Sequence, residues 1–413
     1  MSKITFFFLF LILPCSSVYS QAWVEKSSLP AGAPGRHHPV MFTLGDKGYL
    51  LTGSDAGTDL NDFYQYDPQT DKWAKQPNFP GDARGYAVGL AAGGMGYIGF
   101  GYSANGYLND LWEFSPQTNQ WTAKKSCPCT SREHPALVAA GGKIYVGTGG
   151  SQMGNLKDFW AYDIATDNWK KLADLPSQAR HHPYYFAIGD SVYVGFGHGS
   201  AVVNGVVVYK DFYRYDPPND AWTRLADFPG EGRVAGTQFS HRGKGYILQG
   251  EGDDHDYLGT GEFWEYNPSN DQWKQLPSMP GSGRWAPGNF VIGDSIYLSG
   301  GRQQAVSGGF SDLDDLWMYK FVTSSTTGET EWPSGWHAFP NPANGTLQVQ
   351  YDLSTDLPFQ AQLFNLQGQQ VWYSTLSGAL RLEVPTQHLP AGMYFLKMDF
   401  GAKSAVRKVS VQH

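Results

Sequence analysis

One segment of the chain recurs at a period of 48 to 53 residues, and this repetition limits the architectures available to it. Each copy has an acid, an apolar residue, two aromatic residues at alternate positions, a polar turn and a tryptophan, as in residues 158–169 (DFWAYDIATDNW). Residues 110–121 and 211–222 repeat the pattern with the same spacing. Self-similarity at this period predicts a propeller or a solenoid, in which each unit buries its faces against its neighbours.

Six units can be aligned by three markers at fixed offsets. A tyrosine follows each unit's first arginine by thirteen residues, and a glycine follows that tyrosine by four. The acid of the aromatic segment always precedes the next arginine by 22 residues. The arginines are Arg36, Arg84, Arg132, Arg180, Arg233 and Arg284.

Each unit predicts four strands, which we call a to d. In the third unit, strand a covers 135–140, strand b 143–147 and strand c 159–163, and strand d holds the tryptophan. Fifty glycines, 15% aromatic and 16% charged residues fit short strands and tight turns rather than helices. Sheets of this kind cover one another when they pack radially. We therefore predict an all-β fold whose first domain, residues 21–322, is a six-bladed propeller.

The units resemble kelch repeats in the glycines that end strand b, the aromatic residues of strand c and the tryptophan of strand d. The last unit has no tryptophan seven residues after Tyr319, whereas Trp23 precedes the first arginine without a unit of its own. We predict that the strand of Trp23 completes the sixth blade and closes the ring. Trp332 is the weaker candidate for this place.

The N-terminus predicts export. Lys3, an apolar run over 4–13 and a small-residue site at 18–20 form a signal peptide over 1–20, and we favour it over a lipoprotein signal at Cys15. We expect no membrane span after its removal. Thirty basic against 38 acidic residues argue against nucleic acid as a partner. We expect a monomer without a cofactor.

The end of the chain has a different character. Residues 323–336 are polar and predict a linker, and 337–413 alternate strands with Gly and Pro turns, which predicts a small, Ig-like β-sandwich. This part resembles the C-terminal sorting domain of type IX secretion substrates. The resemblance implies the secretion machinery as a partner and places the protein outside a bacterium or on its outer-membrane surface; the alternative is a carbohydrate-binding sandwich. The residues that carry it are Pro340, Asn341, Pro342, Gly368, Gly392 and Tyr394.

Differences in loop length between the units predict which face of the propeller binds a ligand. Strand parity puts the b–c and d–a loops on one face, and only the b–c loops vary, with inserts at 199–208, 251–261 and 302–314. The first predicts a small hairpin, and the second a solvated acidic loop rather than a cation site. Variable loops on a rigid scaffold are the usual place for recognition.

The arginines have two interpretations. Their repetition in all six units favours a supporting role, in pairs with carboxylates. The alternative is ligand binding, because matching arginines of the kelch adaptors of ubiquitin ligases, whose repeats these units resemble, bind acidic peptides. Non-repeated residues beside them predict a polar, aromatic binding mouth. We expect no metal, because His38, His134 and His182 come from separate blades. The predicted mouth residues besides the six arginines are His38, Tyr86, His134, His182 and Trp285.

Two functions remain open. The first is a non-catalytic module that binds a glycan or a protein through the loop-insert face. The second rests on a resemblance to kelch-type sialic acid mutarotases, which implies a carboxyl acid/base, with Glu133, Glu231 and Glu251 as candidates. Cys127 and Cys129 either form a bridge or stay as free thiols.

Overall fold

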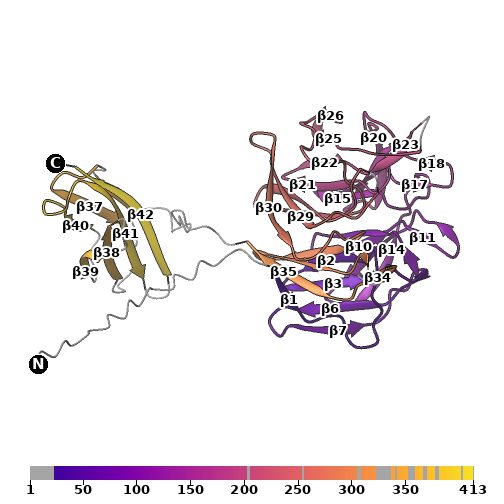
Figure 1. Cartoon of the computed structure of the whole chain (residues 1–413), viewed down its shortest axis with the longest axis horizontal. Coiled ribbons are helices and arrows are strands. Elements are labelled where there is room, and N and C mark those ends of the chain that lie inside the picture. Colours follow the sequence, from indigo (N-terminus) through magenta and orange to yellow (C-terminus); the bar gives the residue numbers. More distant parts are fainter. Residues whose placement is uncertain are drawn as a thin grey trace, which may run out of the picture. The chain divides into compact units, whose positions relative to one another are not determined.

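The computed structural model describes residues 23–201, 205–253, 255–304, 308–321, 336–339, 342–351, 359–365, 370–376, 381–400 and 403–412. Its contacts divide the chain into two compact units, Met1–Phe321 and Val322–His413. Figure 1 shows both as strand-built bodies, and each is described by itself. The predicted signal peptide and most of the predicted linker lie outside the described residues.

The first unit is a ring of antiparallel four-stranded sheets, six of them among its described residues. Each innermost strand contacts the innermost strands of the two neighbouring sheets, and the last contacts the first, so the ring is closed. The fold is therefore the predicted six-bladed propeller. The innermost strands are β2 (Val40–Leu44), β9 (Val88–Ala92), β15 (Ala136–Ala140), β21 (Tyr184–Ile188), β27 (Thr237–His241) and β31 (Gly288–Ile292).

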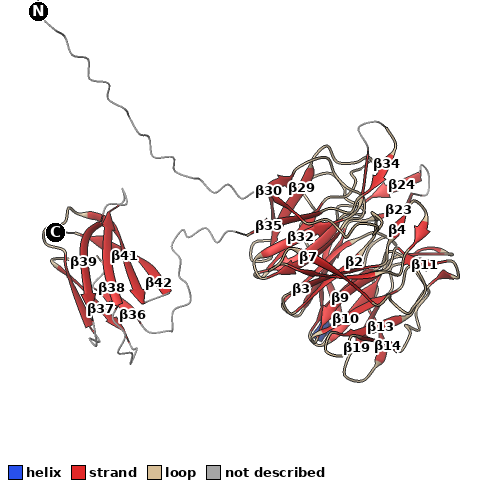
Figure 2. Ribbon diagram, turned by 90° about the horizontal axis from the view of Figure 1, so that it is seen from below, coloured by secondary structure: helices blue, strands red, loops and turns tan. Residues whose placement is uncertain are grey.

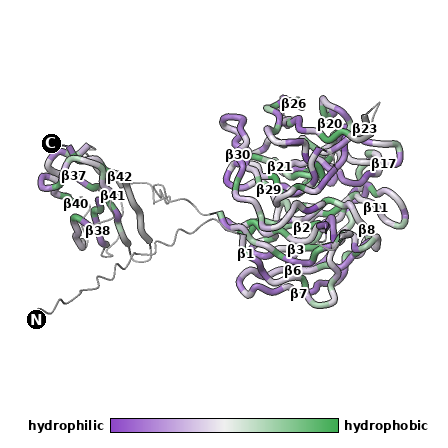
Figure 3. Tube along the Cα trace, viewed as in Figure 1, coloured by the Kyte–Doolittle hydropathy of each residue, from purple (hydrophilic) through white to green (hydrophobic). Residues whose placement is uncertain are grey.

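Burial within each blade is highest in strand b, next to the innermost strand, and lowest in the outermost strand d. The b strands are almost wholly buried, whereas the d strands are largely exposed, and hydrophilic residues gather around β7, β26 and β30 (Figure 3). The b strands are β3 (Lys47–Leu51), β10 (Met95–Gly99), β16 (Lys143–Gly147), β22 (Ser191–Gly195), β28 (Lys244–Leu248) and β32 (Ser295–Ser299). The c strands are β6 (Phe63–Asp67), β13 (Leu111–Ser115), β19 (Phe159–Asp163), β25 (Phe212–Asp216), β29 (Gly261–Asn267) and β35 (Leu316–Lys320). The d strands of the first five blades are β7 (Lys72–Gln76), β14 (Gln120–Lys124), β20 (Asn168–Leu172), β26 (Ala221–Arg224) and β30 (Gln272–Met279).

The ring is closed by the start of the chain. Strand β1 (Trp23–Lys26) pairs antiparallel with β35, with Trp23 opposite Tyr319, and takes the place of strand d in the sixth blade (Figure 1). The ring centroids of Trp23 and Tyr319 are 5.4 Å apart, and only 7% of the Trp23 surface is exposed. The prediction for Trp23 is confirmed; Trp332 lies outside the described residues.

A second closed ring is made of backbone hydrogen bonds. The N–H of the glycine after each b strand donates to the carbonyl of the next blade's arginine, and Gly301 donates to Arg36 at 2.8 Å across the closure. These glycines have φ between 77° and 101°, in the left-handed region. A Cβ on Gly197 would lie 2.5 Å from the carbonyl oxygen of His181, so this position also needs the close approach that glycine allows.

Most b–c loops fold as short hairpins, and the insert at 199–208 is a hairpin as predicted. Figure 2 shows the hairpin strands β4, β11, β23, β24 and β34 gathered on one side of the propeller, which we call the hairpin face. The pairs are β4 (Ser54–Asp55) with β5 (Thr58–Asp59), β11 (Tyr102–Ser103) with β12 (Gly106–Tyr107), β17 (Gly150–Ser151) with β18 (Gly154–Asn155), β23 (His198–Ala201) with β24 (Gly205–Val208), and β33 (Arg302–Gln304) with β34 (Phe310–Asp312). Strand β8 (Arg84–Gly85) pairs with β11, and the 3-10 turn η1 covers Pro217–Asn219.

The second unit consists of two sheets that share one core. Leu347 and Leu382 of one sheet and Leu363, Leu396 and Val409 of the other belong to the same buried cluster. Two sheets packed on a common core form the predicted sandwich. One sheet holds β36 (Trp336–Phe339), β37 (Thr346–Tyr351) and β40 (Arg381–Pro385), and the other β38 (Phe359–Asn365), β39 (Gln370–Leu376), β41 (Gly392–Phe400) and β42 (Lys403–Val411).

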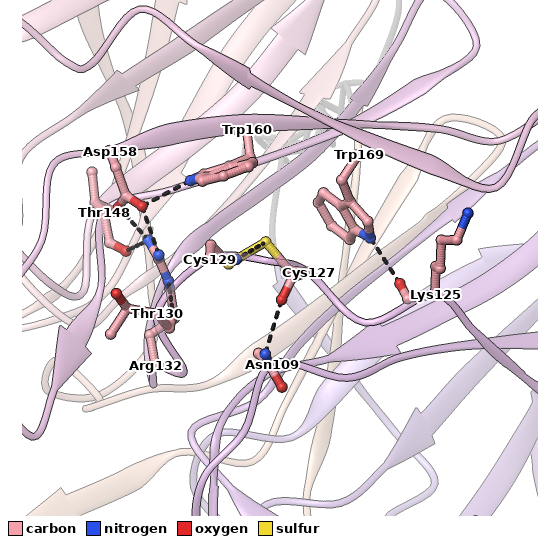
Figure 4. Close-up of a disulfide and its surroundings, with 10 residues drawn as sticks. All are labelled: Asn109, Lys125, Cys127, Cys129, Thr130, Arg132, Thr148, Asp158, Trp160 and Trp169. Carbon is pink, nitrogen blue, oxygen red and sulfur yellow. Dashed lines mark hydrogen bonds and ion pairs between the residues drawn. A yellow bond between two sulfur atoms is a disulfide. The ribbon is translucent and has the colours of Figure 1, made fainter.

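Cys127 and Cys129 form a disulfide in the connection between the second and third blades (Figure 4). Both cysteines are buried, and the side-chain amide of Asn109 donates to the carbonyl of Cys127 at 2.8 Å. Of the two alternatives from the sequence, the structure holds the bridge. A disulfide fits an oxidising compartment outside the cell.

The closure of the ring can be tested at β1. Trp23→Ala removes a large buried side chain at the seam, and we expect the free energy of unfolding to fall by about 3–5 kcal/mol. Val24→Ala on the same strand is the matched control, because Val24 is 48% exposed, and it should change stability little. Urea unfolding followed by circular dichroism measures both. Equal stability of the two variants would contradict closure through Trp23.

Candidate functional site

Three positions in each blade build the opening of the central channel on the hairpin face, which we call the mouth. The first residue after each arginine forms a β-bridge with the first residue after the glycine that ends strand b, in every blade. The second residue after each arginine lies nearer the axis. The bridged pairs are His37 with Ser54, Gly85 with Tyr102, Glu133 with Gly150, His181 with His198, Val234 with Glu251 and Trp285 with Arg302.

The residues nearest the axis form a third ring, which we call the axial ring. All six have φ between 49° and 59°, a left-handed conformation that costs a non-glycine residue about 1 kcal/mol or more. Backbone hydrogen bonds hold this conformation: the N–H of His182 donates to the carbonyl of His134 at 3.2 Å, and His38 donates to Ala286 at 2.8 Å. The axial ring consists of His38, Tyr86, His134, His182, Ala235 and Ala286.

Below the axial ring lies a central cavity of about 400 Å³. It is lined by residues of all six innermost strands, with His38, His134 and His182 at its mouth end. Trp285 and Tyr86 pack on the same histidines, since their rings lie 4.6 Å from that of His38. A small cavity of mixed polar and apolar lining, capped by aromatic and imidazole rings, is the kind of concave site that binds small ligands.

Three histidines of the axial ring, the axial histidines His38, His134 and His182, converge on one point. The Nε2 atom of His38 lies 2.8 Å from Nε2 of His182 and 3.1 Å from Nε2 of His134. These residues are therefore not kept apart by lying in separate blades, and the prediction from the sequence is wrong on this point. In a propeller the same position of every blade meets at the axis, so separation along the ring does not prevent contact.

A second group of imidazoles extends outward from the axis. His198 Nδ1 lies 2.8 Å from His255 Nε2, and His255 Nδ1 lies 3.2 Å from a carboxylate oxygen of Glu251. The ring of His181 packs against that of His198, with the centroids 3.7 Å apart and the planes tilted by 45°. With His37, seven of the chain's eleven histidines thus gather around the mouth.

Burial keeps six of these imidazoles, those of His37, His38, His134, His181, His182 and His198, neutral at neutral pH. Burial lowers the pKa of each axial histidine well below its usual value, and the neighbouring imidazoles lower it further. Burial also lowers the pKa of His37 and of His181 to about 4, and that of His198 to about 2. Neutral imidazoles offer lone pairs as well as N–H donors.

The three candidate glutamates have different surroundings. Burial raises the pKa of Glu133 to about 7, and its carboxylate lies 3.9 Å from Nδ1 of His134 at the mouth. Glu251 also lies at the mouth, where it binds His255. Glu231 is half exposed and pairs with Arg233 at 3.4 Å. The structure thus brings Glu133 and Glu251 into the histidine cluster, and leaves Glu231 with an arginine.

The six repeated arginines are scaffold residues, at most 5% exposed. Arg132 shows the arrangement (Figure 4): its guanidinium donates to both carboxylate oxygens of Asp158 at 2.6 and 2.9 Å, and to the carbonyl of Thr148 at 2.8 Å. The indole N–H of Trp160 donates to the same carboxylate. Because these guanidinium N–H groups are already hydrogen-bonded within the protein, few of them remain to bind a ligand. The partners of the arginines, in chain order, are Asp62, Asp110, Asp158, Asp211, Glu262 and Asp315.

These ion pairs predict the acid sensitivity of the propeller. Burial of Asp158 and Asp211 raises their pKa, but hydrogen bonds and charge from Arg132 and Arg180 outweigh burial, so each pKa lies below 3.8. A carboxyl whose folded pKa is depressed stabilises the fold above its unfolded pKa and loses that contribution as pH falls through the folded value.

We therefore expect the free energy of unfolding to fall as pH drops below about 4. The double variant Asp158→Asn with Asp211→Asn should be less stable at pH 5 and should lose less on acidification. Urea unfolding at pH 5, 4, 3 and 2.5 measures both slopes. Parallel slopes for the variant and the parent chain would contradict a role of these pairs in acid stability.

The remaining predicted mouth residue, Trp285, lies against an arginine that the sequence analysis missed. The Arg302 guanidinium sits 5.6 Å from the Trp285 ring and forms two hydrogen bonds with Asp312, at 2.8 and 2.9 Å. The Arg302 side chain keeps 26% of its surface exposed. The mouth therefore combines an aromatic face with one partly available cation.

Apolar side chains project from the surrounding hairpins. Among the described residues of the first unit, four of the five exposed large hydrophobic side chains belong to b–c hairpins. Tyr102 and Tyr107 pack edge to face at 5.0 Å on one hairpin, and Tyr257 packs against Phe310 at 5.8 Å. The four are Tyr102 (41%), Met153 (91%), Val207 (40%) and Phe310 (63%).

Sequence reasoning found the axial ring but missed half of the mouth. It did not select His37, His181, His198 or Arg302. The signal was present, since the interval from arginine to glycine is constant in all six units. Residues next to the arginine and residues next to the glycine therefore lie on the same face of the propeller. The residue after each glycine was thus an equally good candidate for the mouth.

The sorting-motif residues fall in the second unit. Pro340, Asn341 and Gly368 lie outside the described residues. Pro342 is described, and Gly392 begins β41. The Tyr394 side chain is 5% exposed and donates its hydroxyl to the carbonyl of Pro390 at 2.7 Å, so it belongs to the core of the sandwich.

Comparisons with known proteins agree with this architecture. Residues 35–80 and 131–176 match the Kelch motif, and residues 337–412 match the secretion system C-terminal sorting domain. N-acetylneuraminate epimerase of Shigella sonnei is 26% identical over 162 residues, 38% of this chain and 41% of the relative. The enzyme of the same name from Haemophilus influenzae strain PittEE is 28% identical over 103 residues, 24% of this chain and 28% of the relative. The chain thus spans well under half the length of these curated relatives.

The closed ring of repeated sheets and the matched motifs make this chain a kelch-repeat propeller protein. It carries at its C-terminal end a sorting domain of the Por, or type IX, secretion system, which indicates secretion to the cell surface or the extracellular space. No helix of the described residues is long and apolar enough to cross a membrane.

Proposed function

We propose that the propeller is an exported recognition module that binds a glycan at its mouth. The proposal is supported by the composition of this site: the Trp285 ring and the Tyr86 ring pack on His37 and His38 at the mouth, beside polar groups of His181 and Glu251. Sugars are bound in proteins by an aromatic face together with a few oriented polar groups. The exposed hairpin tips around the mouth are a surface on which a protein ligand would bind instead.

A test separates the two ligand classes. We expect a glycan array with the full chain to give a hit, and Trp285→Ala to weaken binding of that glycan by about tenfold or more in calorimetry. Met153→Ser, at a tip that is 91% exposed, is the matched control and should bind the glycan normally. Loss of binding in Met153→Ser but not in Trp285→Ala, with a protein ligand, would place recognition on the tips and overturn the proposal for the mouth.

A second candidate function is sugar mutarotation. It is favoured by the similarity to proteins named N-acetylneuraminate epimerase and by the position of Glu133 at the mouth. Anomerisation requires a group that can donate and accept a proton, and a carboxylate substrate requires a cation, for which Arg302 is available in part. The match covers 38% of this chain, so the activity is a proposal for this protein.

Proton NMR of N-acetylneuraminate anomers tests this candidate. If the chain accelerates their interconversion, Glu133→Gln should reduce the rate by about 10²- to 10⁴-fold. Glu231→Gln is the control, since that carboxylate lies beside Arg233 rather than in the histidine cluster. No acceleration by the parent chain at any enzyme concentration used would exclude this function for N-acetylneuraminate.

A further inference from the structure

The axial histidines have ring nitrogens that hydrogen bonding alone cannot satisfy. A neutral imidazole has one N–H and one lone pair. When Nε2 of His38 donates, the lone pairs of His134 and His182 both face the same proton, at 3.1 and 2.8 Å. When Nε2 of His38 accepts instead, its single lone pair takes an N–H from only one of the two other rings, and the remaining contact stays unsatisfied. In addition, Nδ1 of His134 is buried and has no hydrogen-bond partner among the described residues.

A metal ion between the three nitrogens would resolve this conflict, because it accepts all three lone pairs at once. One ring nitrogen from each of these histidines can be chosen so that all three lie within 4.8 Å of one another. Zn²⁺ binds imidazole nitrogens at 2.0–2.1 Å, so a tetrahedral site needs nitrogens roughly 3.3 Å apart. The pairs at 2.8 and 3.1 Å need to separate by only a few tenths of an ångström.

The backbone under the axial histidines is rigid enough to hold such a site. Each of them is in a left-handed conformation, with φ of 53° for His38, 49° for His134 and 52° for His182. Hydrogen bonds to the neighbouring blades hold their N–H groups. Unusual conformations of this kind persist where the surrounding structure determines them, and they are enriched at binding sites.

The surroundings of the rings resemble the outer shell of a metal site. Nδ1 of His38 lies 2.7 Å from Nδ1 of His37, and the Glu133 carboxylate lies 3.9 Å from Nδ1 of His134. Ligating histidines usually donate their second N–H to a hydrogen-bond partner, which fixes the ring and the tautomer. For His38 that partner is His37, whereas the Glu133 carboxylate is a nearby charge and not a hydrogen-bond partner of His134. The three side chains also line the central cavity, which gives an ion a route to them.

We propose that Nε2 of His38, His134 and His182 binds one divalent transition-metal ion of the Zn²⁺ class at the propeller axis. Imidazole ligands suit Zn²⁺, Cu²⁺ and Ni²⁺ rather than Ca²⁺ or Mg²⁺. Three protein ligands leave a coordination position for water or for an exogenous group, as in catalytic rather than structural zinc sites. A second trio, His181, His182 and His198, shares one residue with the first and is the alternative that the test must separate.

The first experiment uses the full chain without its signal peptide and without a polyhistidine tag, stripped with a chelator. Titration with Zn²⁺ alone, by calorimetry, should give one ion per chain, and Co²⁺ should give the visible absorption of a four-coordinate site. No sugar is present, so the result does not depend on the proposed function. A stoichiometry well below one, or affinity no better than that of exposed histidines, overturns the proposal.

Variants identify the ligands. His38→Asn, His134→Asn and His182→Asn are chosen because asparagine tolerates a left-handed backbone. Each should weaken Zn²⁺ binding by about a hundredfold or more, since loss of an outer-shell partner alone costs 10- to 100-fold. His241→Asn, on β27 away from the mouth, is the control and should bind normally. Unchanged binding in His38→Asn together with loss in His198→Asn would assign the ion to the second trio instead.

X-ray absorption spectroscopy of the Zn²⁺-loaded parent chain gives a reading that needs no variant. Three imidazole scatterers at 2.0–2.1 Å are expected. A shell dominated by oxygen, or fewer than three imidazoles, overturns the site even if a variant fails to fold.

Discussion

The propeller depends on the burial of six charged guanidinium groups. A buried charge costs several kcal/mol unless it is paired and hydrogen-bonded, so each arginine requires its strand-c carboxylate and backbone carbonyls, such as that of Thr148 for Arg132 or that of Gly232 for Arg233. The backbone of the same arginine accepts a hydrogen bond from the preceding blade. One residue thereby joins a d–a loop, a b–c hairpin and the preceding blade, which explains why it recurs at a fixed distance from the glycine.

The two positions after this arginine have a backbone that is held in the same place in every blade. Their side chains, however, take no part in the arginine's ion pair. The first residue after it is bridged to the hairpin, and the second is held in the axial ring by its backbone. Side chains at these two positions are therefore free to differ, and they do, from Ala235 and Ala286 to His38 and Tyr86. Candidate ligand-binding residues are therefore best sought at positions whose backbone conformation repeats in every blade but whose side chain differs between blades.

The distribution of histidines follows from this geometry. Blades one, three and four contribute the axial histidines, while alanines in blades five and six leave room beside them. Glu251 and His255 come from the acidic insert of blade five, which we expected to be a solvated loop. In the structure Glu251 is 8% exposed and bonded to His255, because its bridge to Val234 draws it into the mouth. A charged loop thus became part of the site through one backbone pairing.

The blade number, the strands, the closure through Trp23 and the face that carries the loops were all predictable from the amino-acid sequence. These follow from periodicity and from residue types whose backbone needs are local. Tertiary structure decided the site. The distance of each position from the propeller axis decides whether an arginine contacts a carboxylate or a ligand. It also decides whether histidines from different blades contact one another. Residues 96 or 144 apart in sequence, such as His38 with His134 or His182, come into contact only because six blades share one axis.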